Sequence, residues 1–550
     1  MQKIEKTVRC FFMKREVMKD VLWLTLAGVL LFFSTLWIRP LGNPDEGRYA
    51  EIPTEMLQSG DWVTPRLNGV LYFEKPPMVY WTQAIAIQCL GENHVAYRFS
   101  SALFALLGVL ATYLAGRAMW GRRTGLLAAG ILATSVLYFG LSQIIILDMA
   151  VSGVLSFALL SFWVGRTQTG GRRRWLFWLA YACMALAVLT KGLIGMLIPG
   201  AILFLWSLLL NRWKEWKQYY LFSGFLIFFV IALPWHLLAT LRNPGFAWFY
   251  FVNEHFLRYL TTAHSRVQPF WFFFVIAAVG FIPWIFFMPQ ALKNAPSAKN
   301  RDSVLFLSIW AVFVLFFFSL SQSKLIPYIL PMFCPLALLL GRQLDALFDD
   351  LRKVLLGFWL TSALFTLLAL AGQWVLEQIH HPITPDYLPL FRLTQGVLLI
   401  AAVFIGLESY RGLYKRALAG VFVGMAMIGL IGGPLFGCFQ RPSTRACAEF
   451  LKTHRTSDAH VFQFYDYYQD FPVYLGEMTG VALHFPEEQS YGLSLEPQPS
   501  RHLSEDTFWP VWRTQKIYGL IEKERFDAFA ERSQAKKLFE DENFVVFSND

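Results

Sequence analysis

The chain has 550 residues, of which 56% are hydrophobic, 17% aromatic and only 16% charged, with a mean hydropathy of +0.43. Soluble proteins carry about 25% charged residues, so this composition excludes a soluble enzyme and indicates an integral membrane protein. The net charge of +10 is unevenly spread, since residues 439–550 contain 12 Lys and Arg against 18 Asp and Glu. The basic excess therefore belongs to the apolar part of the chain, where it follows membrane topology, and a nucleic-acid partner is excluded.

A basic N-terminal tail precedes a first apolar run, which we expect to be a retained helix because no A-x-A cleavage site follows it. About thirteen runs, this one included, approach the length of about 20 apolar residues that spans a bilayer. They lie near residues 21–38, 96–116, 124–141, 148–165, 175–190, 193–210, 220–239, 270–289, 303–320, 325–341, 354–375, 393–408 and 416–437.

The polar segment between the first two runs, residues 39–95, contains charges of both signs. Its motifs are Asn43-Pro44-Asp45-Glu46-Gly47-Arg48-Tyr49 and Tyr72-Phe73-Glu74-Lys75-Pro76-Pro77. A connecting loop needs only Gly, Pro, Asn and Ser to turn, and polar residues beside a membrane are often functional. Because phosphate binds Lys and Arg, the segment is typical of a site for a phosphate-bearing lipid. A salt-bridged interfacial loop is the alternative.

Lys and Arg residues cluster in alternate loops along the chain, including those near residues 117–123, 166–174, 212–217, 293–301, 342–353 and 411–416. The positive-inside rule assigns these loops, together with the basic N-terminus, to the cytoplasm. An odd number of spans then places the last 110 or so residues on the external side.

The external side is poor in basic residues, and several of those present lie beside acids or aromatic residues. These groups are Asp148, Thr190-Lys191-Gly192, Asn253-Glu254-His255 with Arg258, and Ser323-Lys324 with Pro327-Tyr328. We expect a single external pocket lined by carboxylates and cations.

The C-terminal segment 439–550 reads as a small α/β domain that follows a transmembrane domain of residues 1–438. It mixes strand-like runs with helical runs, at His460–Tyr465, Val481–Phe485 and Phe544–Phe547 and near 443–453 and 521–534. It contains no nucleophile elbow, phosphate loop or metal spacing, so we assign it a role in shaping the acceptor side. A disulfide between Cys438 and Cys447 is left open.

These motifs, with Arg48-Tyr49-Ala50-Glu51, Gly60-Asp61-Trp62 and Thr190-Lys191-Gly192, resemble the bacterial aminoarabinose transferases of lipid A. That family belongs to the protein O-mannosyltransferase-like group of polyprenyl-phosphate-dependent membrane glycosyltransferases. The resemblance covers nearly the whole chain, and its first-loop motifs identify the superfamily better than the sugar. It implies a multi-pass protein of the bacterial inner membrane, with a cytoplasmic N-terminus and a periplasmic C-terminus, that takes a sugar from undecaprenyl phosphate.

The resemblance also implies roles for single residues. Asp45 matches the family's essential acid and Asp148 its second acid, and Glu46 joins them as a catalytic candidate. Lys75, Lys191 and Arg258 would hold the lipid phosphate and stabilise it as the leaving group. The remaining substrate-binding candidates are Arg48, Tyr72, Glu74, His255, Lys324 and Tyr328.

Several points stay open at this level. An acceptor hydroxyl needs a general base, whereas a lipid A phosphate is already ionised and needs none, so the role of Asp45 depends on the acceptor. Glu74 and His255 could hold a divalent metal ion, although two ligands are a weak signal. Another sugar passed to a protein, glycan or lipid hydroxyl is an alternative. A lipid-linked sugar flippase is disfavoured, because no internal repeat is visible and the polar residues gather on one side.

Overall fold

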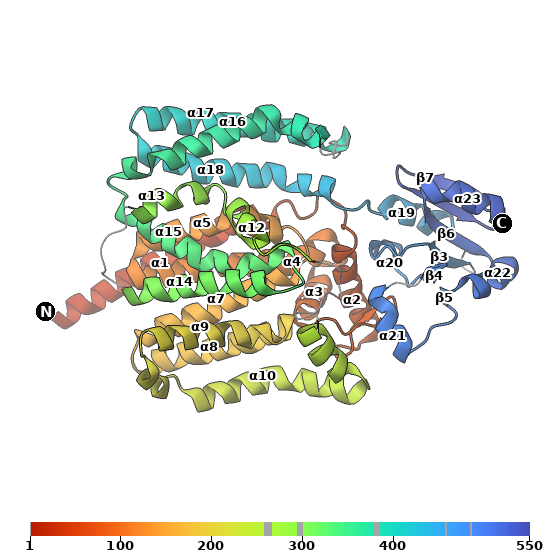
Figure 1. Ribbon diagram of the computed structural model, residues 1–550, viewed down its shortest axis with the longest axis horizontal. Coiled ribbons are helices and arrows are strands. Elements are labelled where there is room, and N and C mark those ends of the chain that lie inside the picture. The colour runs from red at the N-terminus through yellow and green to blue at the C-terminus, as the bar shows by residue number, and fades with distance from the viewer. Residues whose placement is uncertain (1, 258–266, 294–300, 379–384, 457–458, 485–486) are drawn as a thin grey trace. The chain divides into compact units, whose positions relative to one another are not determined.

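The computed structural model describes residues 2–257, 267–293, 301–378, 385–456, 459–484 and 487–550. The chain divides into two compact units, each built from segments far apart in sequence (Figure 1). Unit 1 consists of residues 1–36, 101–233 and 257–438, and unit 2 of residues 37–100, 234–256 and 439–550. Unit 2 thus combines the polar first loop with the C-terminal segment, whereas the sequence-based division groups that loop with the transmembrane part.

Within its described residues, the regular secondary structure of unit 1 consists of helices. Two further helices, α4 (His94–Trp120) and α10 (Leu221–Arg242), begin in one unit and end in the other. The helices of unit 1 are α1 (Gln2–Phe33), α5 (Arg122–Ala133), α6 (Val136–Ser142), α7 (Leu147–Arg166), α8 (Gly170–Lys191), α9 (Ile194–Leu209), α12 (Phe272–Gly280), α13 (Met288–Lys293), α14 (Arg301–Leu320), α15 (Phe333–Ala346), α16 (Leu355–Gln378), α17 (Leu388–Tyr410) and α18 (Tyr414–Gly432).

Every apolar run expected from the sequence falls on a helix or on a bent pair of helices. Within the described part of the chain, nine helices are long and apolar enough to cross a membrane, or up to eleven if each bent pair counts as one span. The bent pairs are α5 with α6, at 65°, and the helices on either side of residue 282, at 100°. Two of the thirteen expected runs, on α1 and on the 16-residue α9, do not meet this measure.

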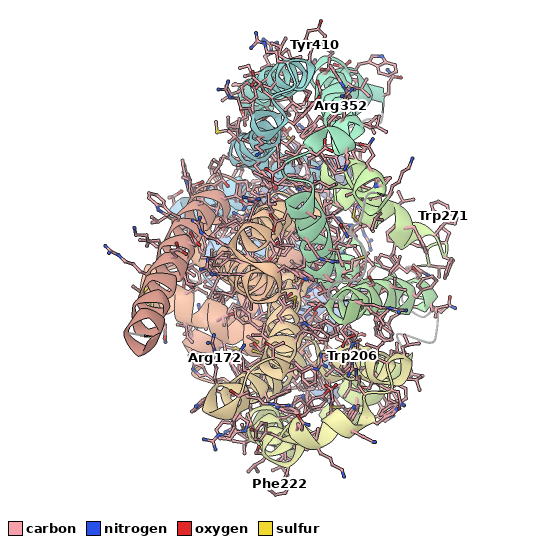
Figure 2. The ribbon with its side chains drawn as sticks, turned by 90° about the vertical axis from the view of Figure 1, so that its left-hand side faces the viewer. Arg172, Trp206, Phe222, Trp271, Arg352 and Tyr410 are labelled. Atoms are coloured by element: carbon pink, nitrogen blue, oxygen red, sulfur yellow. The ribbon has the colours of Figure 1, made fainter. Side chains whose placement is uncertain are left out.

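Large apolar side chains cover the outside of unit 1. Phe222 is 89% exposed and Tyr410 is 83% exposed, and both project outward in Figure 2. Trp271, labelled in the same view, is 61% exposed. A water-soluble protein does not present so many apolar side chains, whereas a lipid-facing surface requires them. The protein is therefore a polytopic helical membrane protein.

The first loop is folded rather than irregular. Its helix α2 (Asp45–Ser59) starts with two acidic residues, which the positive end of the helix dipole stabilises. The helix ends at Gly60, whose left-handed φ of 71° lets its N–H bond the carbonyl of Met56. The hairpin β1 (Arg66–Leu67) and β2 (Val70–Leu71) and the helix α3 (Met78–Leu90) follow. The charged residues of the first motif therefore lie on a helix, where the sequence indicated a loop, whereas Glu74 and Lys75 lie in the irregular segment before α3.

The C-terminal segment forms a six-stranded mixed sheet in the order β5-β4-β3-β6-β8-β7. Strands β3, β4, β5 and β6 are parallel, whereas β8 is antiparallel to both β6 and β7. The elements are α19 (Arg445–His454), β3 (His460–Phe464), α20 (Asp470–Leu475), β4 (Gly480–Ala482), α21 (Ser490–Leu495), β5 (His502–Leu503), α22 (Glu505–Thr514), β6 (Ile517–Glu522), α23 (Lys523–Ser533), β7 (Lys536–Glu540) and β8 (Phe544–Ser548).

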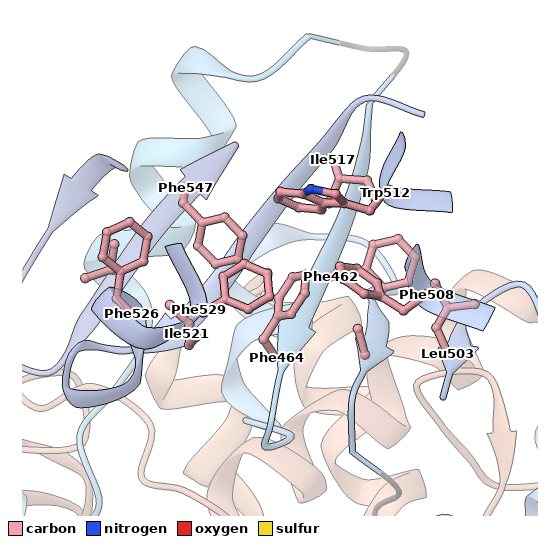
Figure 3. Packing of buried hydrophobic residues seen from close by; sticks show 12 residues of the cluster. Phe462, Phe464, Leu503, Phe508, Trp512, Ile517, Ile521, Phe526, Phe529 and Phe547 are labelled. Carbon is pink, nitrogen blue, oxygen red and sulfur yellow. The ribbon is translucent and has the colours of Figure 1, made fainter. Parts of the chain in front are cut away.

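Both faces of this sheet are buried by helices. Alternate residues of a central strand point to opposite sides, so they pack into two different clusters. Ile517 and Ile521 of β6 join the cluster with α22 and α23, which Figure 3 shows around Phe464 and Phe529. Tyr518 and Leu520 of the same strand join a second cluster with α19 and α20. The predicted small α/β domain is thus confirmed, as a mixed sheet between helices.

Three strands and two helices of this domain were expected from the sequence, and β5, β6 and β7 were not. The helical run expected at 521–534 is wrong at its start, because residues 521 and 522 finish strand β6. The run expected at 481–485 ends at residue 485, which lies outside the described residues.

Candidate active site

Glu46, on the first turn of α2, is clamped by two arginines of unit 2. Its carboxylate accepts hydrogen bonds from Arg39 at 2.6 and 2.9 Å and from Arg98 at 2.8 Å twice. The N–H of Gly42 and the side chain of Gln440 add contacts at 3.0 and 3.2 Å. Burial alone would raise the pKa of Glu46, but the charges and hydrogen bonds of Arg39 and Arg98 hold this pKa well below its usual value. Glu46 therefore sits in a closed ion-pair network.

Asp45, the preceding residue, faces the other way. Its side chain is 62% exposed and accepts a hydrogen bond of 2.9 Å from Arg48, one turn along α2. The side chain of Arg48 is 13% exposed, and its guanidinium also pairs with Glu488 of the C-terminal segment. A mostly buried cation thus lies beside an accessible carboxylate, an arrangement that can orient a charged substrate.

Arg48 and two neighbouring tyrosines have buried donor atoms that lack partners. Its Nε, the hydroxyl of Tyr72 and the hydroxyl of Tyr80 are buried and find no hydrogen-bond partner among the described residues. The rings of Tyr49 and Tyr80 lie 6.1 Å apart, and burial, with the charge of Glu74, raises the pKa of Tyr72. A buried polar group without a partner costs about 1–3 kcal/mol, so three of them together indicate that a ligand supplies the missing acceptors.

Lys75 is bound to the segment that follows α10. Its Nζ donates to Glu254 at 2.8 Å and to the carbonyl of Glu74 at 2.8 Å, while the Glu74 carboxylate lies 3.9 Å away. Glu254, whose side chain is 2% exposed, belongs to a π-helical stretch at Trp248–Leu257. Such stretches are rare and occur often at functional sites. The side chain of the neighbouring His255 and the whole of Arg258 lie outside the described residues, so their expected roles stay predictions.

A second cluster lies in unit 1. Asp148, on the first turn of α7, accepts a hydrogen bond from Lys191, the last residue of α8. The Lys191 ammonium also lies 4.2 Å from the ring centre of Tyr328, so it makes a cation–π contact. Lys324, 6% exposed, donates to the carbonyl of Ser321 at 2.5 Å, and burial lowers its pKa.

The structure thus brings together Asp45, Arg48 and Tyr72 in unit 2 and Asp148, Lys191 and Tyr328 in unit 1, from segments far apart in sequence. The expectation of one pocket that gathers both sets stays a prediction. In the parts of the chain with described side chains, no group of three or more His, Cys, Asp or Glu residues is arranged to hold a metal ion. Metal binding by Glu74 and His255 also stays a prediction.

A buried carboxyl pair on α2 was missed from the sequence. Glu51 accepts a hydrogen bond from Tyr467 at 2.7 Å, and Glu55 accepts one from the N–H of Gly69 at 3.0 Å. Burial raises the pKa of Glu55 to about 6, and burial together with Glu55 raises the pKa of Glu51 further. Their i, i+4 spacing could have indicated a shared helix face, but only if α2 had been recognised as a helix.

Comparisons with known proteins show the family of the chain. Residues 24–250 match the family model of dolichyl-phosphate-mannose-protein mannosyltransferases. The chain is 33% identical over 420 residues to an undecaprenyl phosphate-alpha-4-amino-4-deoxy-L-arabinose arabinosyl transferase of Pseudomonas paraeruginosa, covering 74% of this chain and 75% of that protein. A transferase of the same name from Pectobacterium carotovorum is 34% identical over 366 residues, covering 64% of this chain and 65% of that protein.

Solved structures extend the similarity over the whole chain. The crystal structure of ArnT from Cupriavidus metallidurans bound to undecaprenyl phosphate superposes with a TM-score of 0.86 at 27% identity, covering 97% of this chain and 98% of that one. The oligosaccharyltransferase AglB of Archaeoglobus fulgidus, with a TM-score of 0.52 at 13% identity, covers 94% of this chain and 70% of that one and shares the fold alone.

Proposed function

Because the chain belongs to the family of undecaprenyl phosphate-aminoarabinose arabinosyl transferases, we propose that it transfers 4-amino-4-deoxy-L-arabinose from undecaprenyl phosphate to a phosphate of lipid A. The protein is a membrane glycosyltransferase with a polyprenyl-phosphate sugar donor. The identity of the acceptor, a phosphate of lipid A, is the more specific part of the proposal. A lipid A phosphate is ionised at neutral pH, so the reaction needs no strong general base.

One observation carries the proposal, namely the three buried donors around Arg48 that lack partners. A guanidinium N–H and two phenolic O–H groups donate hydrogen bonds, and the oxygens of phosphates and sugars accept them. A donor headgroup made of a phosphate and a sugar would supply these acceptors. Asp45, exposed next to Arg48, would then orient the acceptor or stabilise positive charge that develops on the sugar ring or its amino group.

The lysines suit the leaving group. When the glycosidic bond breaks, the bonding electrons stay with the oxygen of undecaprenyl phosphate, and a nearby ammonium stabilises that negative charge. Lys75 and Lys191 are both held by a carboxylate, Glu254 and Asp148 respectively, so their positions are set before substrate arrives. Glu46, closed off by Arg39 and Arg98, acts in this proposal by positioning the first turn of α2.

The proposed orientation is that of a bacterial inner-membrane protein with thirteen spans, a cytoplasmic N-terminus and a periplasmic C-terminus. Its support is the alternation of Lys- and Arg-rich loops, which the positive-inside rule assigns to the cytoplasm. Asp45, Lys75, Asp148 and Lys191 then lie on the periplasmic side.

The test is transfer by the purified protein in liposomes. Radiolabelled undecaprenyl phosphate-aminoarabinose and lipid A are supplied together, and the product is read by thin-layer chromatography and mass spectrometry. We expect label on lipid A, and none when a dephosphorylated lipid A replaces it. Equal labelling of the dephosphorylated lipid would contradict a phosphate acceptor, and label on neither would contradict the proposed reaction.

A further inference from the structure

A cavity of about 410 Å³ lies within the C-terminal sheet domain, away from the residues discussed above. Three adjacent parallel strands end at it, since Tyr465 directly follows β3, Leu483 follows β4 and Ser504 follows β5. In open α/β sheets, ligands bind outside the carboxyl ends of the strands. The place of the cavity in the sheet is therefore that of a binding site.

The backbone at this edge adopts an uncommon conformation. Tyr465 has a φ of 63° and Leu483 a φ of 59°, in the left-handed region that residues other than Gly seldom occupy. Both are held there, because the N–H of Tyr465 bonds Ala482 at 3.1 Å and that of Leu483 bonds Leu503 at 2.9 Å. Backbone strain of this kind persists only where the surroundings enforce it, and it gathers at ligand sites.

The wall of the cavity offers an aromatic ring and hydrogen-bonding groups without a net charge. The hydroxyls of Ser504 and Thr507 lie 3.2 Å apart at the start of α22. Arg532 is paired with Glu505 at 2.6 Å, so its charge is balanced. The ring of Tyr465 forms part of the same wall. A phosphate or a nucleic acid would need an excess of cations, so these groups favour a neutral ligand rich in hydroxyls.

His502 completes the wall. Its Nε2 lies 3.0 Å from the side-chain oxygen of Gln489, whereas its buried Nδ1 finds no partner within the described chain. Burial, with Arg501 nearby, lowers the pKa of His502 to about 4, so the ring is neutral at physiological pH. A neutral ring nitrogen without a partner can be satisfied by a ligand hydroxyl.

From these features we propose that the cavity binds a saccharide unit. The Tyr465 ring stacks on the sugar, the hydroxyls of Ser504 and Thr507 and the ring of His502 bond its hydroxyl groups, and the volume is in the range of small-molecule sites. Because this proposal is argued from the cavity alone, it does not depend on the proposed transfer reaction. The sugar could belong to the acceptor lipid or be of the donor type, and the probes separate these sources.

The experiment is saturation-transfer NMR on the full-length protein in deuterated detergent. The probes are a soluble glucosamine disaccharide and methyl arabinopyranoside. We expect saturable binding of at least one sugar. Tyr465→Asn, which removes the ring but tolerates a left-handed backbone, weakens binding about tenfold. Thr507→Ala weakens it about fivefold.

Thr514→Ala is the matched control, because it removes an exposed hydroxyl at the other end of α22. It should bind sugar like the unmodified protein. If Tyr465→Asn folds poorly in a thermal melt, Thr507→Ala, at an exposed position, decides the question. The proposal is overturned if neither sugar binds saturably, or if Thr507→Ala and Thr514→Ala bind alike. Saccharide binding by a protein that transfers no aminoarabinose would support this site and contradict only the proposed function.

Discussion

Asp45 and Glu46 are neighbours in sequence with opposite surroundings, and their variants should behave differently. Asp45 is exposed, so Asp45→Asn should abolish transfer without affecting folding. Glu46→Gln leaves two buried arginines without their carboxylate, which should destabilise the protein by about 3–5 kcal/mol. Transfer assays in liposomes and thermal melts measure the two effects. Normal turnover by folded Asp45→Asn would remove this residue from the catalytic mechanism.

Lys75→Ala should weaken use of the undecaprenyl phosphate donor about tenfold or more, because a charge-assisted contact to phosphate contributes about 1.5–3 kcal/mol. The single variant also leaves Glu254 buried and unpaired. The double variant Lys75→Ala/Glu254→Gln removes that second effect. Donor KM and kcat measured for both variants tell the roles apart. If the double variant uses donor normally, Lys75 serves only as the counterion of Glu254.

The pair Glu51 and Glu55 should make stability depend on pH. Burial raises the pKa of Glu55 from 4.5 to about 6 in the folded protein, so folding takes up a proton between these values. A carboxyl group whose pKa is raised in the folded state stabilises the protein at low pH, and this contribution to stability is lost as the pH rises through about 6. The apparent Tm in detergent should fall between pH 5 and pH 7.5. Glu55→Gln should flatten this slope, and an unchanged slope would show that other groups titrate.

At the scale of elements, the close contact between strands β6 and β8 should be sensitive to one added methyl group. A Cβ at Gly519 would lie 2.1 Å from the ring of Phe547, which is buried in the cluster of Figure 3. Gly519→Ala should therefore destabilise the C-terminal domain by about 1–3 kcal/mol. Hydrogen exchange of β8 in the full chain reports this loss.

Gly171→Ala is the control for this substitution, because a Cβ there meets nothing within 4 Å. Its exchange rates in β8 should equal those of the unmodified protein. Faster exchange in both variants would mean that the contact between Gly519 and Phe547 is not the cause.

The elements that could be predicted are those with a strong local signal. Long apolar runs identify membrane helices because backbone groups in lipid must be bonded within the helix. Strand β6 could not be predicted, since its run Ile517–Glu522 is short and merges with the helix that follows it. Helix α2 was missed because its buried face is made of Glu46, Glu51 and Glu55 as well as apolar residues, which hides the amphipathic pattern.

Only part of the candidate site could be predicted from the sequence, because several of its residues carry no strong local signal. Asp45, Lys75 and Lys191 stand out as charges beside apolar runs. Arg39 and Arg98 lie in ordinary junctions, and only the fold shows that both contact one carboxylate. The partnerless hydroxyls of Tyr72 and Tyr80 are likewise a property of packing.

At the scale of the whole molecule, the proposed orientation makes a direct prediction. The alternation of basic loops gives an odd number of spans, so a reporter fused after Asp550 should lie in the periplasm. Alkaline phosphatase at this position should be active, and green fluorescent protein should be dark. Fusions after Arg172, in a basic loop, are the control and should give the opposite result. A fluorescent fusion at Asp550 would contradict the proposed placement of Asp45 and Lys75.

The Glu46 network also limits how the protein can be recombined. The chain passes between the two units near residues 36, 100, 233, 256 and 438. Within a few residues of the first two junctions and the last one, a side chain contacts Glu46, namely Arg39, Arg98 or Gln440. Exchanging residues 439–550 with those of a relative therefore replaces one member of a network whose other members stay behind. A chimera that keeps Gln440 from the host, or takes residues 37–100 along with the new domain, preserves the contacts of Glu46 with all three side chains. Residues 37–100 and the start of the C-terminal segment should therefore be exchanged together, although they lie far apart in the sequence.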